Sequence, residues 1–346
     1  MKTNCMNRGL TWVEVLVMLV IAFFALGLLL PSIGGPREAA RRTNCMNKVR
    51  QIGLGLQSYE SSNRVFPPSA SVTNDGPGKP ATVGGWSFLV RILPFMDYDQ
   101  LYKTLSADGN PEDFSITATA AAMNTVIQEF VCPTNGNRLQ RDPNAIPPTG
   151  AFTNYKGMGA STKNSLMMAL DPSLSPPYGT ASQHPDGMMF PGKGTRRDEI
   201  PDGLSRTIAT IETIDDACSR WTVGREVTLV GLPQRSSPTV STPQPPLNYF
   251  VPPGFDHTWG RDSAVAKAGL RTFLAYDFSP TGADAGKYED PGFSKTPPAY
   301  GPSSAHPAVV ICGFGDGSVQ AISKQIDAAN LFFLITKNNS DPFFAP

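Results

Sequence analysis

The distribution of apolar residues separates a helical N-terminal part of this chain from a body of short strands and loops. Residues 10–30 form an almost continuous apolar run, and Glu14 is the only charged residue inside it. At about 1.5 Å per residue, a helix over this run would be about 31 Å long, close to the thickness of a bilayer's hydrocarbon core. The pattern therefore predicts a transmembrane helix over residues 10–30.

A second helix is predicted after a short interruption. Prolines and glycines between positions 31 and 36 should kink or break the first helix where it leaves the membrane. The polar run 37–42 then favours a helix. Apolar side chains follow at alternating four- and three-residue steps, which places them on one helical face: Cys45, Val49, Ile52, Leu56 and Tyr59. We expect this face to pack against a β-sheet.

The rest of the chain is predicted to contain short strands separated by loops. Strands are expected at 126–131, 154–158, 188–190, 207–213 and 225–230, and helices at 97–102 and 117–124, while 86–95 fits either element. The C-terminal pattern is the most regular. Residues 308–314 and 318–323 flank Asp316-Gly317, a dipeptide typical of a type I′ turn with positive φ at both positions. A hairpin within 306–323 and a short helix from Asp327 are therefore predicted.

Composition and charge narrow the functional classes. The chain has 346 residues, with 32 glycines and 33 prolines, which favours a loop-rich α+β body over a helical one. Its 29 basic and 29 acidic residues balance. Nucleic-acid binding therefore lacks its main electrostatic support, and we expect no nucleic-acid partner.

Cysteines and histidines show no recognisable metal-binding spacing. Beyond the N-terminal leader the cysteines are Cys45, Cys132, Cys218 and Cys312, and the histidines are His184, His257 and His306. Neither set matches a zinc pattern, so we expect no metal site and no cofactor. In an oxidising compartment four cysteines permit two disulfides in three possible connectivities. Cys45 and Cys132 are both expected to face the core, and we predict a disulfide between them.

Catalysis and calcium binding are weaker alternatives. A catalytic set would need His306, Asp316 and a serine such as Ser304 or Ser318, but an aspartate at a hairpin tip is poorly placed to orient an imidazole. We therefore assign no catalytic residue and predict no enzyme activity. Carboxylates that might hold calcium are clustered at Asp198-Glu199 with Asp202, Asp215-Asp216 and Glu289-Asp290. None has an EF-hand pattern, and solvated loop charges explain them.

The N-terminus resembles a type IV prepilin signal. The apolar run is preceded by a short cationic leader and begins within Arg8-Gly9-Leu10-Thr11-Trp12-Val13-Glu14. A secretory signal would have a shorter apolar core and a small-residue cleavage site. The resemblance implies that a prepilin peptidase removes leader residues 1–9 after Gly9 and methylates Leu10. A glutamate in lipid needs a partner, and in pilins the implied partner is a neighbouring subunit's N-terminal amine, so Glu14 is the expected assembly residue.

Further motifs extend the resemblance along most of the chain. They are Arg37-Glu38-Ala39-Ala40-Arg41-Arg42, Cys45, Gln51-Ile52-Gly53-Leu54, Phe66-Pro67-Pro68, Cys132-Pro133, residues 200–208, and His306 followed after nine residues by Asp316-Gly317. Together they resemble a bacterial family of exported proteins. Its members combine a prepilin-type cleavage and methylation segment, a body domain of unknown function and a C-terminal H-X9-DG processing-associated domain. Leu10 and Trp12 depart from the usual Phe and Leu but remain apolar.

The resemblance implies a pilin-like α+β fold. A long N-terminal helix would have a membrane half and a half packed on an antiparallel sheet, with residues 31–346 forming a loop-rich periplasmic body on a single-pass inner-membrane anchor. The implied function is a pseudopilin-like subunit of a type IV pilus or type II secretion-like assembly. Its partners would be a prepilin peptidase, other pilin-like subunits and inner-membrane assembly machinery. The alternative is a membrane-tethered periplasmic module that binds a solute or polymer, for which Glu14 would be dispensable.

Overall fold

The chain divides into two compact units, Met1–Thr43 and Asn44–Pro346. The computed structural model describes residues 11–29, 34–73, 82–107, 121–135, 150–161, 165–166, 168–170, 176, 181–213, 219–231, 302–324, 326 and 328–338. Gly9 and Leu10, the predicted processing residues, lie outside this part of the chain. So do Asp327, Cys218 and the acidic pairs at 215–216 and 289–290.

The first unit contains helix α1, Trp12–Leu29. A reciprocal hydrogen-bond pair begins it: Glu14 Oε2 accepts from the Thr11 backbone N–H at 2.8 Å, and the Glu14 N–H donates to Thr11 Oγ1 at 3.4 Å. This arrangement satisfies donors that a helix start otherwise leaves unpaired. Among the residues that the structure describes, no helix combines the length and apolar character needed to cross a membrane.

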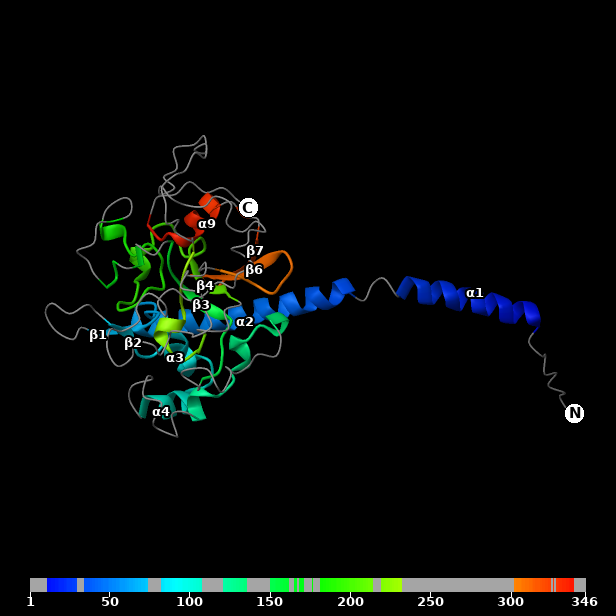
Figure 1. The fold of residues 1–346 in the computed structure, drawn as a ribbon, viewed down its shortest axis with the longest axis horizontal. Helices are drawn as coiled ribbons and strands as arrows, with labels where there is room; N and C mark the ends of the chain where they lie inside the picture. The colour runs from blue at the N-terminus through cyan, green and yellow to red at the C-terminus, as the bar shows by residue number, and fades with distance from the viewer. Residues whose placement is uncertain are drawn as a thin grey trace, which may run out of the picture. The chain divides into compact units, whose positions relative to one another are not determined.

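Helix α2, Gly34–Asn63, confirms the predicted buried face. Cys45, Val49 and Ile52 are fully buried, Leu56 is almost so, and Tyr59 packs against the same core. The predicted interruption between the helices falls mainly on residues 30–33, outside the described residues, and Gly34–Pro36 already belong to α2. The part of α2 in the second unit runs beside the β6–β7 hairpin (Figure 1). There Gly53 approaches the hairpin turn so closely that a Cβ would lie 3.1 Å from the Gly317 Cα.

The second unit is built on a five-stranded sheet in the order β5-β3-β4-β6-β7. The strands are β3 Tyr155–Ala160, β4 Ile208–Glu212, β5 Thr228–Val230, β6 Val309–Phe314 and β7 Val319–Ser323. Most neighbours are antiparallel, but β3 and β5 are parallel. The expected antiparallel sheet is therefore corrected to a mixed one. The reason is topological: β5 follows β4 and runs opposite to it, but takes its place beyond β3.

The C-terminal hairpin is confirmed, whereas the predicted turn type is wrong. Gly317 has a φ of +83°, and Asp316 is not among the described residues with positive φ. The Gly317 N–H donates to the Phe314 carbonyl at 2.9 Å, and the Phe314 N–H donates to the Ser318 carbonyl at 2.9 Å. The loop therefore contains three residues, and only the last of them needs the left-handed conformation.

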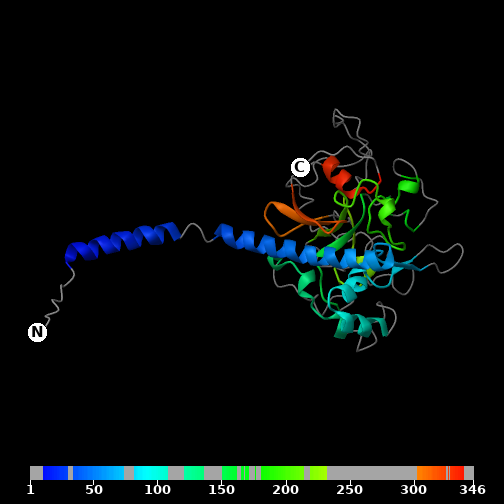
Figure 2. The same ribbon diagram turned by 180° about the vertical axis from the view of Figure 1, so that it is seen from behind.

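The sheet separates two apolar clusters. Helix α9, Ala328–Ile335, packs against one face together with Val310, Cys312 and Phe314 of β6. Ile311, which alternates with them, belongs to the larger cluster beneath α2. Figures 1 and 2 both show the strands between α2 and α9. Residues that follow one another along a strand thus face different helices.

Short helices and irregular segments complete the described part of the second unit. They are β1 Ser71–Thr73, β2 Thr82–Gly84, α3 Phe88–Ile92, α4 Asp99–Ala107 and the 3-10 helices η2 Leu93–Phe95, η3 Gln128–Phe130, η4 Pro133–Asn135, η5 Ala181–Gln183, η6 Arg197–Glu199 and η7 Gly224–Glu226. Two predicted strands are wrong. Residues 126–131 form η3 and its flanks because the Phe130 and Val131 N–H groups bond to nearby carbonyls, and 188–190 forms bends.

Candidate metal centre

Four side chains that can bind metals meet in the second unit. They are Cys45 of α2, Cys132 between η3 and η4, Glu212 at the end of β4, and His306 before β6. Their ligand atoms all lie within 4.8 Å of one another. None of the four residues is more than 1% exposed. The fold therefore concentrates two sulfurs, an imidazole nitrogen and a carboxylate oxygen in one dry site.

Backbone-directed hydrogen bonds fix the loop that carries Cys132. The Cys132 N–H donates to Asn154 Oδ1 at 2.8 Å, and Asn154 Nδ2 donates to the Thr213 carbonyl at 3.2 Å. Lys48 of α2 donates to the Val131 carbonyl at 2.8 Å. Cys132 is thus tied both to the end of β4 and to the helix that carries Cys45.

Glu212 presents one carboxylate oxygen to the cluster. Its Oε2 accepts from the Ile311 N–H at 3.3 Å, while its Oε1 lies 3.9 Å from His306 Nε2. The same His306 Nε2 is 3.6 Å from Cys132 Sγ. Within the described part of the chain, Glu212 Oε1 is buried and has no hydrogen-bond partner. A polar atom in this condition is uncommon in native structures and indicates a missing partner.

Burial sets the ionisation of the cluster. Desolvation, reinforced by Cys132, raises the pKa of Glu212 to about 8. A hydrogen bond to Cys45 and then burial raise the pKa of Cys132, and the same bond lowers the pKa of Cys45. Without a cation, the site therefore favours its protonated forms. A metal ion bound here would release protons as it binds.

The structure changes two expectations about these residues. Cys45 and Cys132 both face the core, as predicted, but they are free thiols, which corrects the predicted disulfide. The expectation of no metal site rested on spacing, and spacing misses this cluster because its members come from four distant segments. Glu212 was not singled out at all. The available signal was that Cys45, Cys132 and His306 each lie in one of the recognised motifs.

The other residues of the C-terminal motif have a structural role. Asp316 Oδ1 accepts from the Ser318 N–H at 2.8 Å, and the Asp316 N–H donates to the Leu204 carbonyl at 3.1 Å. The turn is thereby tied to the 200–208 motif. A six-residue strand separates Asp316 from the segment that holds His306. The considered set of His306, Asp316 and a serine is therefore not assembled.

The described calcium candidates are paired with cations. Asp198 lies 3.2 Å from Arg196 Nε, and Glu199 lies 2.8 Å from Lys193 Nζ. The neighbouring Asp202 contributes its N–H, which donates to the Lys337 carbonyl at 3.4 Å. These contacts fit the interpretation of loop charges that are satisfied by their neighbours.

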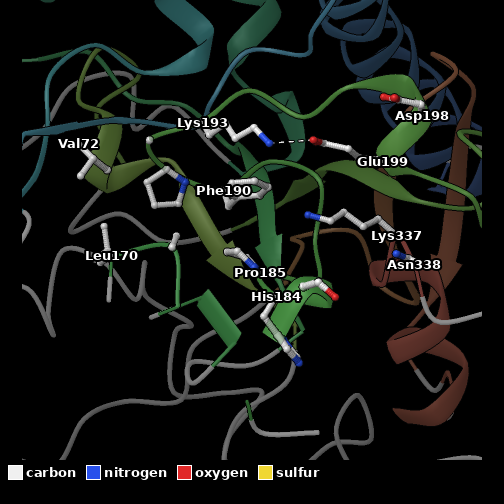
Figure 3. A pocket seen from close by; sticks show the side chains of 14 residues that line it. Val72, Leu170, His184, Pro185, Phe190, Lys193, Asp198, Glu199, Lys337 and Asn338 are labelled. Atoms are coloured by element: carbon white, nitrogen blue, oxygen red, sulfur yellow. Dashed lines mark hydrogen bonds and ion pairs between the residues drawn. The ribbon is translucent and has the colours of Figure 1, made fainter. Parts of the chain in front are cut away.

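A second feature is an open cavity of ≈ 720 Å³ bordered by η5, η6 and the end of the chain that follows α9 (Figure 3). Lys337 Nζ lies 4.4 Å from the centre of the Phe190 ring on its wall, and Lys193 pairs with Glu199 across it. Burial lowers the pKa of Lys337 to about 8. The cavity thus combines an apolar wall with two amines and His184, a composition suited to a small anionic solute.

Beside this cavity Ser165, His184 and Asp186 come together, but not in the order of a catalytic triad. The Ser165 hydroxyl lies 2.7 Å from His184 Nδ1 and 2.8 Å from Asp186 Oδ1. In a triad the imidazole lies between the serine and the carboxylate. Asp186 Oδ1 also accepts from the Ser161 N–H at 2.8 Å. The carboxylate therefore organises the serine-bearing segments.

The fold and the cluster define a mixed α+β body domain, preceded by an apolar helix, with a buried Cys₂-His-Glu set. A family model described as "Protein of unknown function (DUF1559)" matches residues 35–329. The match covers most of the chain, and the chain belongs to this family. It includes all four cluster residues and leaves α1 outside. Neither a curated protein nor a solved structure matches the chain.

Proposed function

We propose that this chain is a membrane-anchored, pseudopilin-like subunit that a prepilin peptidase processes and that joins a type IV pilus or type II secretion-like assembly. The carrying observation is the character of α1. Its apolar side chains are exposed, with Trp12 and Phe23 each 79% accessible, and Glu14 is its single charged residue. A helix that is apolar on all sides needs lipid or other helices around it.

Glu14 is the proposed assembly residue. In the isolated chain its Oε2 also accepts from the Thr11 hydroxyl at 2.9 Å, so the carboxylate is held at the N-terminal end of α1. Cleavage after Gly9 would create a new amine on Leu10 close to that end. In lipid, an unpaired carboxylate and an unpaired amine are each costly, and pairing them between adjacent subunits relieves both.

Processing is tested on the mature N-terminus. Protein extracted from its native membrane should begin with N-methylated Leu10 in mass spectrometry, because the cationic leader stays cytoplasmic and presents Gly9 at the membrane face. The Gly9→Ala variant should retain residues 1–9. Intact Met1 in the wild-type protein would end this part of the proposal.

Assembly is tested with Glu14→Ala, using Val15→Ala in the same turn as the matched control. Both variants should insert into the membrane, since neither adds a charge. Only Glu14→Ala should lose crosslinking to neighbouring subunits and co-purification with the assembly machinery. Equal crosslinking in the two variants would overturn the pseudopilin proposal.

The cavity of Figure 3 favours one alternative, a membrane-tethered module that binds a small anionic solute. This function predicts full activity in Glu14→Ala. It also predicts that Lys337→Met abolishes the thermal stabilisation produced by carboxylate or phosphate solutes. Stabilisation that survives this substitution would place the solute elsewhere and remove the support for the cavity.

A further inference from the structure

We propose that Cys45, Cys132, Glu212 and His306 form a structural zinc site that joins α2 to the sheet. The proposal is independent of membrane anchoring and of assembly, since it rests on side chains buried within the second unit. It concerns a ligand set drawn from four segments, each of which places one donor atom in the same small volume.

The separations fit tetrahedral zinc. Zinc–sulfur bonds of about 2.3 Å and zinc–nitrogen bonds of about 2.0 Å place tetrahedral S and N ligands about 3.6 Å apart. The separation between Cys132 Sγ and His306 Nε2 is 3.6 Å. A tetrahedral N and O pair is about 3.4 Å apart by the same reasoning, and His306 Nε2 lies 3.9 Å from Glu212 Oε1. The remaining pairs are within 4.8 Å, so small side-chain movements complete the coordination.

The donor chemistry selects zinc among common metals. Calcium and magnesium prefer sets made of oxygen ligands, whereas thiolates and imidazole suit zinc. Four protein ligands with no open position are typical of structural zinc, because catalytic sites keep one position for water or substrate. Complete burial of the four residues agrees with a closed site.

The unpartnered carboxylate oxygen independently points to a cation. Glu212 is held through Oε2 by the Ile311 N–H, which directs Oε1 into the cluster without a hydrogen-bond partner among the described residues. A buried polar atom left in this state costs free energy that a bound cation would offset. The alternative occupant, a disulfide between Cys45 and Cys132, would consume both sulfur donors and leave Glu212 Oε1 unsatisfied.

The surrounding contacts are those of a prepared site. The Ile311 N–H orients Glu212, Asn154 fixes the Cys132 backbone, and Ser304 Oγ accepts from the His306 N–H at 3.0 Å. Such outer contacts hold ligands in position and are typical of metal sites. With zinc bound, the ion would link α2, the Cys132 loop, β4 and the segment before β6, so metal binding would be coupled to folding of the body.

The first test measures metal content of the full-length chain, purified anaerobically without chelator. We expect about one zinc per chain in the wild type and an at least tenfold loss in Cys132→Ser and in His306→Gln. Cys312→Ser is the matched control. Cys312 is an equally buried free thiol, but it faces α9 on the other side of the sheet and should leave the zinc content unchanged.

The second test uses only the wild-type chain, so it does not depend on how the variants fold. Cobalt should replace the zinc and give thiolate-to-metal charge transfer with the visible bands of tetrahedral cobalt. Alkylation and mass spectrometry should find Cys45 and Cys132 reduced and protected by the metal. A Cys45–Cys132 disulfide in the purified chain overturns the proposal, as do reduced thiols that take up neither zinc nor cobalt.

Discussion

The contact between α2 and the hairpin turn predicts opposite effects for two glycines of the same helix. Gly53→Ala would place a Cβ 3.1 Å from the Gly317 Cα and 3.4 Å from its carbonyl oxygen. Gly55→Ala would place a Cβ 3.1 Å from Cγ and 3.3 Å from Sδ of Met96. The first neighbour is backbone held in a hydrogen-bonded turn, whereas the second is the flexible end of a side chain.

The magnitudes follow from two terms. Replacing a mid-helix glycine by alanine stabilises the helix by about 1 kcal/mol in both variants. At position 53 the displaced turn adds an overpacking cost of about 1–3 kcal/mol, because Gly317 is fixed by its bond to the Phe314 carbonyl. At position 55 the Met96 thioether can rotate away at little cost. We expect Gly53→Ala to be destabilising by about 1 kcal/mol and Gly55→Ala to be neutral or stabilising by up to about 1 kcal/mol.

Denaturant unfolding followed by tryptophan fluorescence measures this difference, since Trp221 is fully buried in the body core. Both variants should keep the wild-type denaturant dependence, so that the midpoints report stability alone. If Gly53→Ala is as stable as Gly55→Ala, the close approach of α2 to the hairpin turn is wrong.

Two further substitutions test buried charges. The pKa of Lys337 is about 8, below its ordinary 10.5. The unfolded chain therefore binds more protons between these values, and the free energy of unfolding should rise with pH across them, by at most about 3 kcal/mol. Lys337→Met should remove this rise, and an unchanged pH profile would contradict the assignment. Glu226 accepts from Arg220 Nε at 2.8 Å, with both side chains fully buried. Glu226→Gln leaves Arg220 without a counter-charge and should lower the free energy of unfolding by about 3 kcal/mol in urea titrations. A loss below about 1 kcal/mol would show that the pair is dispensable.

Patterns of short range determined the elements that the sequence predicted well. The buried face of α2 follows from helical spacing, and the hairpin follows from two apolar runs around a turn. The turn type was missed because a two-residue and a three-residue loop share the Asp316-Gly317 signal. The stretch 126–131 was missed because its apolar residues pack irregularly on the core and form no ladder.

Only the tertiary structure decided the sheet order and the cluster. The place of β5 beyond β3 depends on how the chain crosses the sheet, which no local period encodes. Spacing rules for metals describe ligands on one turn or loop, whereas Cys45, Cys132, Glu212 and His306 are brought together by packing of four distant segments. The sequence by itself determined which residues face inward, because periodicity is a local property of the backbone. Which inward-facing residues meet was decided by packing, because that depends on contacts across the whole body.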